Sequence, residues 1–289
     1  MRSTPHSSLE TWAAKAARPW TREALADLRA AAGAFRLGFT GAFAAWPALV
    51  GRVAFYCVCL MVLGAFWGKV GASRLPGTLA ARLPPGGLGP YVGVTEWIVI
   101  SVVTVQLRFE DEVRSGALEA RLLRPRSWGL LLIAEAAGGT AARMLAIAPA
   151  ALALLVMSGL WPGPQAVVRA ALLALGGAVL TLLLYALVGL SAFWVRRVLP
   201  AMLITQKLMF LLGGLFAPIS LYRGWLHALA FASPFAAQLG FPGQAILSMS
   251  WGGFARALAA QGAWVSVLAV IVALACRAGV AKTLREGAS

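Results

Sequence analysis

The sequence predicts an all-α polytopic membrane protein with six transmembrane helices. Of its 289 residues, 60% are hydrophobic and only 12% are charged, whereas soluble domains carry about 25% charged residues. The apolar residues gather into long blocks, and a helix needs about 20 of them to cross about 30 Å of hydrocarbon. Lipid is therefore the expected solvent for most of the chain.

Three regions follow from the positions of the polar segments. Residues 1–45 are expected to form a cytoplasmic tail and an amphipathic helix, residues 46–277 the six-span domain, and residues 278–289 a second cytoplasmic tail. The helical spacing near the N-terminus involves Leu25, Leu28, Ala32, Phe35 and Phe39, with Arg22, Arg29 and Arg36 between them. This pattern is typical of a helix lying along the inner leaflet, although an ordinary surface helix shows it too.

Six apolar blocks are long enough to be membrane spans. They lie at Ala48–Gly68, Pro90–Leu107, within Leu130–Leu160, within Ala166–Val195, at Val198–Ala217 and at Ala257–Cys276. The third and fourth blocks exceed the length that the hydrocarbon requires, so tilting, cytoplasmic extension or a break is expected there. Gly138 and Gly139 are a candidate break in the third block.

The distribution of Lys and Arg predicts the orientation and the anionic partner. If the N-terminus is inside, the inner segments hold most of the basic residues, so both termini are predicted to be cytoplasmic and the protein to lie in the cytoplasmic (inner) membrane. The net charge of +15 would suggest nucleic acid in a soluble protein. Because the basic residues flank apolar blocks, lipid headgroups are expected instead, and no nucleic acid.

A long, aromatic-rich segment, residues 219–256, precedes the last block. Prolines interrupt it, and its aromatic residues suit the headgroup region. Because non-helical backbone at membrane depth must be buried in protein, a re-entrant outer hairpin of two short helices is predicted. Its candidate functional residues are Pro218, Trp225, Pro234 and Phe235.

One charge-dense stretch, residues 109–128, separates the second and third blocks. It reads FEDEVRSGALEARLLRPRSW, with acidic residues first and basic residues last, an order that favours a helix through its macrodipole. Pro125 would end that helix, which is predicted over Asp111–Arg124 and parallel to the membrane. A solvated inner loop would have a broadly similar charge pattern.

This stretch resembles the loop after the second span in the type-2 permeases of ATP-binding-cassette exporters. The residues that carry the likeness are Glu110, Glu112, Gly116, Leu118, Glu119, Leu122 and Pro125, with Gly116 shifted by Ser115. The form SGALEARLLRP is most similar to an uncharacterised bacterial branch in which two different permeases often share one ATPase. A second block resembles that branch's fifth span and outer hairpin: Gln206, Lys207, Gly213, Gly214, Pro218, Trp225, Leu226 and Ser233–Ala236.

The resemblance implies half of an exporter, driven by a separate ATPase subunit and paired with a second permease, either another copy or a different chain. It implies that residues 109–128 form the coupling helix that contacts the ATPase. The coupling candidates are Glu110, Glu112, Arg114, Gly116, Leu118, Glu119, Leu122, Leu123, Arg124 and Pro125. The sequence contains no G-x-x-x-x-G-K-[ST] phosphate loop, so ATP and Mg are expected on the partner and no cofactor on this chain.

Ionisable and polar residues within apolar blocks are further candidates, because such groups are costly in lipid. They are Lys207, Gln206, Arg143, Glu96 and Glu135. Lys207 would lie near the midplane, either lining a cargo path or permease interface or forming a structural pair. Arg143, Glu96 and Glu135 could instead extend to a membrane interface.

Two other classes of function compete with a permease. An intramembrane enzyme needs a nucleophile with a base, or a metal, but His6, His227, Asp27 and Asp111 all lie outside the predicted spans. No metal site is predicted, since Cys57 and Cys59 would point apart on a helix. An ion-coupled carrier or channel stays open, with Glu96 and Glu135 as its only membrane carboxylates. Amphipathic or lipid-like cargo fits the aromatic hairpin.

Overall fold

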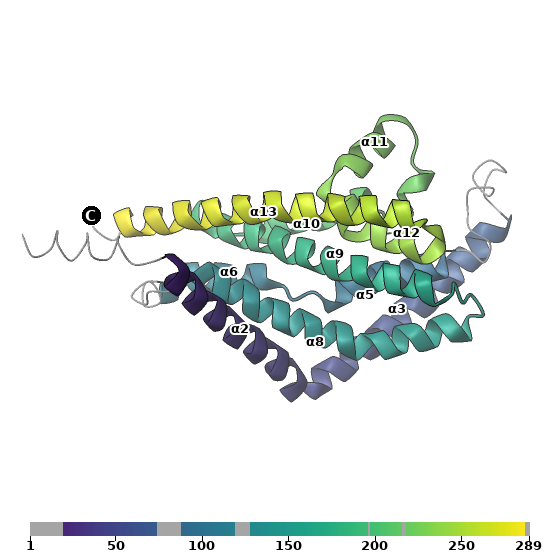
Figure 1. Cartoon of the computed structure of the whole chain (residues 1–289), viewed down its shortest axis with the longest axis horizontal. Coiled ribbons are helices and arrows are strands. Elements are labelled where there is room, and N and C mark those ends of the chain that lie inside the picture. Colours follow the sequence, from purple (N-terminus) through teal and green to yellow (C-terminus); the bar gives the residue numbers. More distant parts are fainter. Residues whose placement is uncertain (1–19, 74–87, 119–127, 196, 216–217, 287–289) are drawn as a thin grey trace, which may run out of the picture.

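The computed structural model describes residues 20–73, 88–118, 128–195, 197–215 and 218–286. Within these ranges the chain is helical and contains no strand. Its long helices run side by side along the longest axis of the molecule (Figure 1). The predicted all-α class is therefore confirmed.

Within the described ranges, five helical segments are long and apolar enough to cross a membrane. They are Trp46–Trp67, Gly89–Arg114, Trp128–Met157, Pro164–Phe193 and Trp251–Arg285. They correspond to the first, second, third, fourth and sixth predicted spans. The last belongs to helix α13, Trp251–Glu286, which begins inside the segment predicted to be the outer hairpin.

The block predicted as the fifth span forms a shorter helix, α10, Leu199–Leu212. Its 14 residues extend about 21 Å, less than the roughly 30 Å of a hydrocarbon core. The helix ends because Gly213 follows it and Gly214 has a φ of +73°, a conformation that glycine adopts without steric cost. The predicted Val198–Ala217 span is thus too long at its C-terminal end.

The N-terminal helices α2, Trp20–Ala44, and α3, Trp46–Ser73, meet at Ala45 and form a V (Figure 1). Helix α2 crosses α8, Trp128–Met157, at very short range. A Cβ atom added to Gly38 would overlap the backbone of Glu135, and one added to Gly138 would overlap that of Phe35. The glycines were predicted to break the third block. Instead α8 is continuous through Gly138 and Gly139, and their missing side chains admit α2.

The second span is broken where the sequence predicted continuous helix. Helix α5 covers Gly89–Ser101 and helix α6 covers Val105–Arg114. Val102 between them is extended, with a φ of −68° and a ψ of 135°. The break starts α6 well before Asp111, where the polar helix was predicted to begin.

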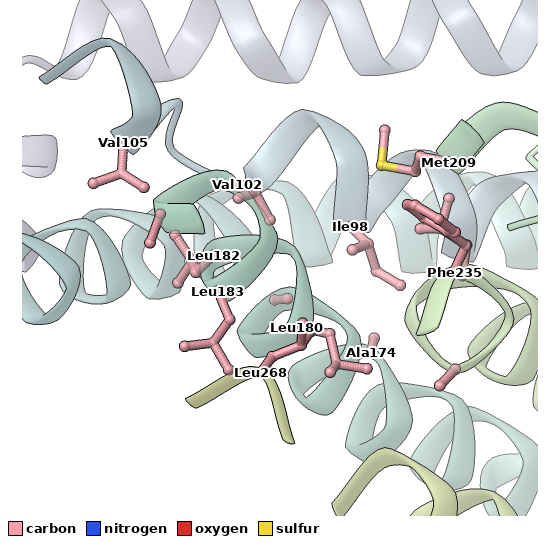
Figure 2. Packing of buried hydrophobic residues seen from close by; sticks show 14 of the residues in the cluster. Ile98, Val102, Val105, Ala174, Leu180, Leu182, Leu183, Met209, Phe235 and Leu268 are labelled. Atoms are coloured by element: carbon pink, nitrogen blue, oxygen red, sulfur yellow. The ribbon is translucent and has the colours of Figure 1, made fainter. Parts of the chain in front are cut away.

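Helix α9, Pro164–Leu190, lies at the centre of the bundle and contacts α5, α6, α12 and α13. Figure 2 shows the core around it, where Leu180, Leu182 and Leu183 lie among side chains of α5, α6, α10 and α13. Two adjacent glycines of α9 bring neighbouring elements close, since added Cβ atoms would meet Gln261 at Gly176 and Gln238 at Gly177. The absence of side chains at this pair therefore allows the close packing.

Short helical elements connect α10 to α13. They are η2, Ile219–Leu221; α11, Gly224–Ala232; the π-helical turn η3, Ala236–Gly240; and α12, Phe241–Ser248. Helix α11 projects from the bundle (Figure 1), and Trp225 on it is 76% exposed. Helix α12 instead packs on α5 and α9, with Phe241 and Ile246 buried. The re-entrant position of this segment in the membrane stays a prediction.

The α2–α8 crossing predicts a stability difference between two glycines of one helix. Gly38→Ala should lower the free energy of unfolding by about 1–3 kcal/mol, because the new methyl group overlaps the Glu135 carbonyl. Gly33→Ala is the matched control, since no atom lies within 4 Å of its added Cβ. It should leave stability unchanged or raise it by up to about 1 kcal/mol. Equal thermal unfolding of the two variants in detergent would contradict the crossing.

Candidate functional site

The predicted coupling stretch divides into a helical part and a turn. Helix α6 ends at Arg114, Ser115 caps it, and Gly116 has a φ of +73°. A left-handed glycine is a common way to end a helix, so the single helix predicted over Asp111–Arg124 is wrong at this point. Five of the coupling candidates lie outside the described residues: Glu119, Leu122, Leu123, Arg124 and Pro125.

Aromatic packing fixes α6 to the bundle. Phe109 is fully buried, and its ring meets that of Trp128 edge-on at a centroid distance of 5.1 Å. Trp128 in turn meets Phe193, at 6.1 Å. On the other side, a Cβ added to Gly189 of α9 would lie 2.7 Å from the Cβ of Phe109. Helix α6 is therefore packed closely against both α8 and α9.

Two of the three glutamates predicted to contact the ATPase, Glu110 and Glu112, form hydrogen bonds within the chain. Glu112 is only 9% exposed, and its carboxylate accepts a hydrogen bond from the indole N–H of Trp128. Oε1 of Glu110 accepts hydrogen bonds from Arg114, at 3.4 Å, and from the backbone N–H of Val198, at 3.4 Å. Because Val198 is the N-cap of α10, Glu110 links α6 to the start of that helix. Leu118 is also buried.

The half-buried Glu110 and the exposed polar groups beside it form a shallow depression of about 570 Å³. We name this depression the α6 surface; its lining residues are Glu110, Asp111, Arg114, Ser115 and Arg197. Sequence reasoning included Glu110 and Arg114 among the coupling candidates but missed the other three. Arg197 comes from the turn before α10, and the Glu110–Val198 hydrogen bond brings that turn to α6.

The intramembrane candidates lie in separate places. Glu135 of α8 forms an ion pair with Arg108 of α6, with Nη1 and Oε1 2.6 Å apart. Arg143 donates to the carbonyl oxygen of Val102 at 3.4 Å. Glu96 is half-buried on α5. Among the described residues, the five candidates form no hydrogen bond or ion pair with one another.

The two candidates on α10, Gln206 and Lys207, differ in exposure. Lys207 is exposed, with Nζ 5.8 Å from the ring centroid of Phe210, and Gln206 is half-buried. Leu203, Ile204 and Leu211 are also exposed on this helix. Helix α10 therefore presents a largely apolar face with one cation on it.

Two buried amides that sequence reasoning missed connect the hairpin to the core. Gln238 of η3 donates to Oγ1 of Thr181 at 2.6 Å. Gln261 of α13 donates to the carbonyls of Leu173 and Ala237, both at 2.8 Å. Neither amide stands in a recognisable motif, so only their three-dimensional neighbours reveal this role. Phe235, a hairpin candidate, is also buried here, while Pro218 is the N-cap of η2.

The part of the chain that the structure describes contains no cluster of metal-binding side chains. No group of three or more His, Cys, Asp or Glu side chains there could hold a metal ion.

Comparison with known proteins identifies the family of this chain. The family model described as "ABC-2 family transporter protein" matches residues 91–286, which is more than half of the chain. The chain belongs to the ABC-2 transporter family. The match includes both blocks that resemble type-2 permeases, and this prediction is confirmed. No curated protein and no solved structure matches.

Membership defines this ABC-2 protein as a multi-pass membrane permease of an ABC transporter. The family is a membrane transport component whose own chain is not catalytic, and it works with an ABC ATPase. The five apolar helices agree with that membrane role.

The contact between Glu112 and Trp128 predicts a structural cost for losing the indole N–H. Trp128→Phe should lower the free energy of unfolding by about 1–3 kcal/mol, because a buried carboxylate loses a donor. Trp194→Phe is the control, since Trp194 is 51% exposed. Thermal unfolding in detergent measures both. An unfolding temperature of Trp128→Phe equal to that of the wild-type protein would show that Glu112 does not depend on this donor.

Proposed function

We propose that this chain is the permease subunit of an ABC exporter in the cytoplasmic membrane, moving an amphipathic or lipid-like substrate. A separate ATPase subunit, which binds ATP and Mg, supplies the energy, and a second permease, another copy or a different chain, completes the transporter. Family membership supports the permease role. The observation that carries the coupling proposal is the α6 surface, which is charged, exposed and built on a fixed helix.

Helix α6 is connected to three parts of the bundle, so a push on it would be transmitted. Phe109 contacts α9 at Gly189, Glu110 bonds to the start of α10, and Arg108 pairs with Glu135 of α8. Closure of an ATPase dimer against the α6 surface would move these helices together. The extended residue Val102 gives α6 a place to turn relative to α5. Rigid movement of packed helices is a common route between alternative states.

The exposed face of α10 supports the partner permease. No other described residue covers the apolar side chains and Lys207 on this face. The helix is also too short to cross the bilayer by itself. Packing against a second permease would bury this face. The alternative, an ion-coupled carrier, would need carboxylates within the membrane to bind the ion. Of the two predicted ones, Glu135 is already paired with Arg108, which leaves Glu96.

Charge reversal on the α6 surface tests the ATPase contact. The double variant Asp111→Lys/Arg114→Glu should reduce co-purification of the ATPase at least about tenfold, which corresponds to about 1.4 kcal/mol. The charges oppose those of the wild type, while the buried Phe109 and Glu112 stay in place. Pull-down of the tagged chain followed by mass spectrometry measures the amount of ATPase retained.

Arg256→Glu is the control, because this exposed arginine lies at the other end of the molecule, near the start of α13. It should retain the ATPase at the wild-type level. Recovery of undiminished ATPase with the double variant would reject the α6 surface as the contact. Absence of any ATPase from the wild-type pull-down under gentle extraction would instead favour the ion-coupled carrier.

A further inference from the structure

Two arginines from different helices meet at the break in the second span. Nη1 of Arg52, on α3, donates to the carbonyl oxygen of Ile100 at 3.3 Å. Nη1 of Arg143, on α8, donates to the carbonyl oxygen of Val102 at 3.4 Å. The two carbonyls are freed because α5 ends at Ser101, where the last turn of a helix has no further N–H donors. The two guanidinium groups are thus held beside the same short piece of backbone.

The positive charge of this arginine pair is not neutralised within the described part of the chain. The ion pairs found there join Arg108 to Glu135 and Arg114 to Glu110, and neither includes Arg52 or Arg143. Both arginines are half-buried within helices long and apolar enough to span a membrane. Cations in such a setting are costly without an anionic partner. Each guanidinium has five N–H donors, and the described residues accept from one donor of each.

An apolar cleft of about 480 Å³ begins one helical turn from the arginine pair. We name it the α3–α8 cleft, since those helices form much of its wall, with α5, α9 and Ile246 of α12 completing it. Tyr56, one turn beyond Arg52, and Ala148, just over one turn beyond Arg143, both line it. Trp97 also lines the cleft, and its indole N–H bonds to the carbonyl of Met144, next to Arg143. The charged pair and the apolar cleft therefore adjoin.

The cleft opens towards the apolar outer surface and is long enough for a hydrocarbon chain. Its lining includes Met61, Leu152 and Met157, which are 60%, 44% and 82% exposed. The lining residues on the α8 side run from Ala148 to Ser158, just past the end of the helix, or about 15 Å at 1.5 Å per residue. That length matches the roughly 15 Å half-thickness of a bilayer's hydrocarbon core.

We propose that Arg52, Arg143 and the α3–α8 cleft form a binding site for an anionic phospholipid. The two guanidinium groups bind the phosphate of the headgroup, and an acyl chain occupies the cleft. Guanidinium groups bind phosphate oxygens through paired, charge-assisted hydrogen bonds. The negative charge of the phosphate compensates the positive charge of the two arginines, and the acyl chain fills the apolar cleft. This binding needs no ATPase, so it stands independently of the proposed function.

The test uses the purified full chain in an uncharged detergent, with retained lipid measured by native mass spectrometry. Dioleoyl phosphatidylglycerol should be retained at least about tenfold more than dioleoyl phosphatidylcholine, because only the former has a net negative headgroup; tenfold is about 1.4 kcal/mol. The double variant Arg52→Gln/Arg143→Gln should abolish this preference. Arg256→Gln should keep it, since this arginine likewise donates to a helix carbonyl, that of Gly252 at 3.3 Å, but is exposed.

A second variant tests the cleft and keeps the arginines. Ala151→Phe should fill the cleft and weaken retention of dioleoyl phosphatidylglycerol several-fold, while Ala255→Phe, at an exposed position of α13, should not. Inorganic phosphate in millimolar excess should fail to displace the lipid, because it lacks an acyl chain. Equal retention of the two lipids by the wild type, an undiminished preference in the arginine variant, or displacement by phosphate alone would overturn the assignment.

Discussion

Backbone groups that lipid cannot satisfy impose the main constraint on this bundle. The second span breaks at Val102–Thr104, and a break inside an apolar bundle leaves carbonyl and N–H groups without partners. Three neighbouring side chains supply those partners. Arg52 and Arg143 bond to the freed carbonyls, and Oγ1 of Thr140 accepts from the N–H of Val103 at 3.1 Å. The break is stable only because α3 and α8 pack beside it.

The position of α6 depends on that break. Since α6 is a separate helix, its aromatic residue Phe109 can lie against Gly189 of α9 while Glu112 reaches Trp128 of α8. Phe109 and Glu112 are therefore buried, whereas Asp111 and Arg114 on the same helix are exposed. Buried and exposed residues thus alternate along a single short helix.

Missing side chains are as important as present ones in this core. Gly38 and Gly138 admit α2 to α8, Gly176 and Gly177 admit buried glutamines to α9, and Gly189 admits α6. Lipid offers little hydrophobic driving force between helices, so close van der Waals packing and hydrogen bonds must hold them together. The glycines allow the close packing, and they leave room for the side chains that form the hydrogen bonds.

The sequence by itself determined the helical membrane class, most of the spans and the family, because lipid demands long apolar blocks and the polar stretch has a recognisable order. It also located the polar segment around Glu110. Only the tertiary structure decided that the second span breaks, that Gly138 and Gly139 are a contact rather than a kink, and that Glu112 is buried. It alone brought Arg197 to α6 and Arg52 to Arg143. These features depend on contacts between residues far apart in the chain, and hydrophobic periodicity reports only the solvent that each helix meets, not its neighbours.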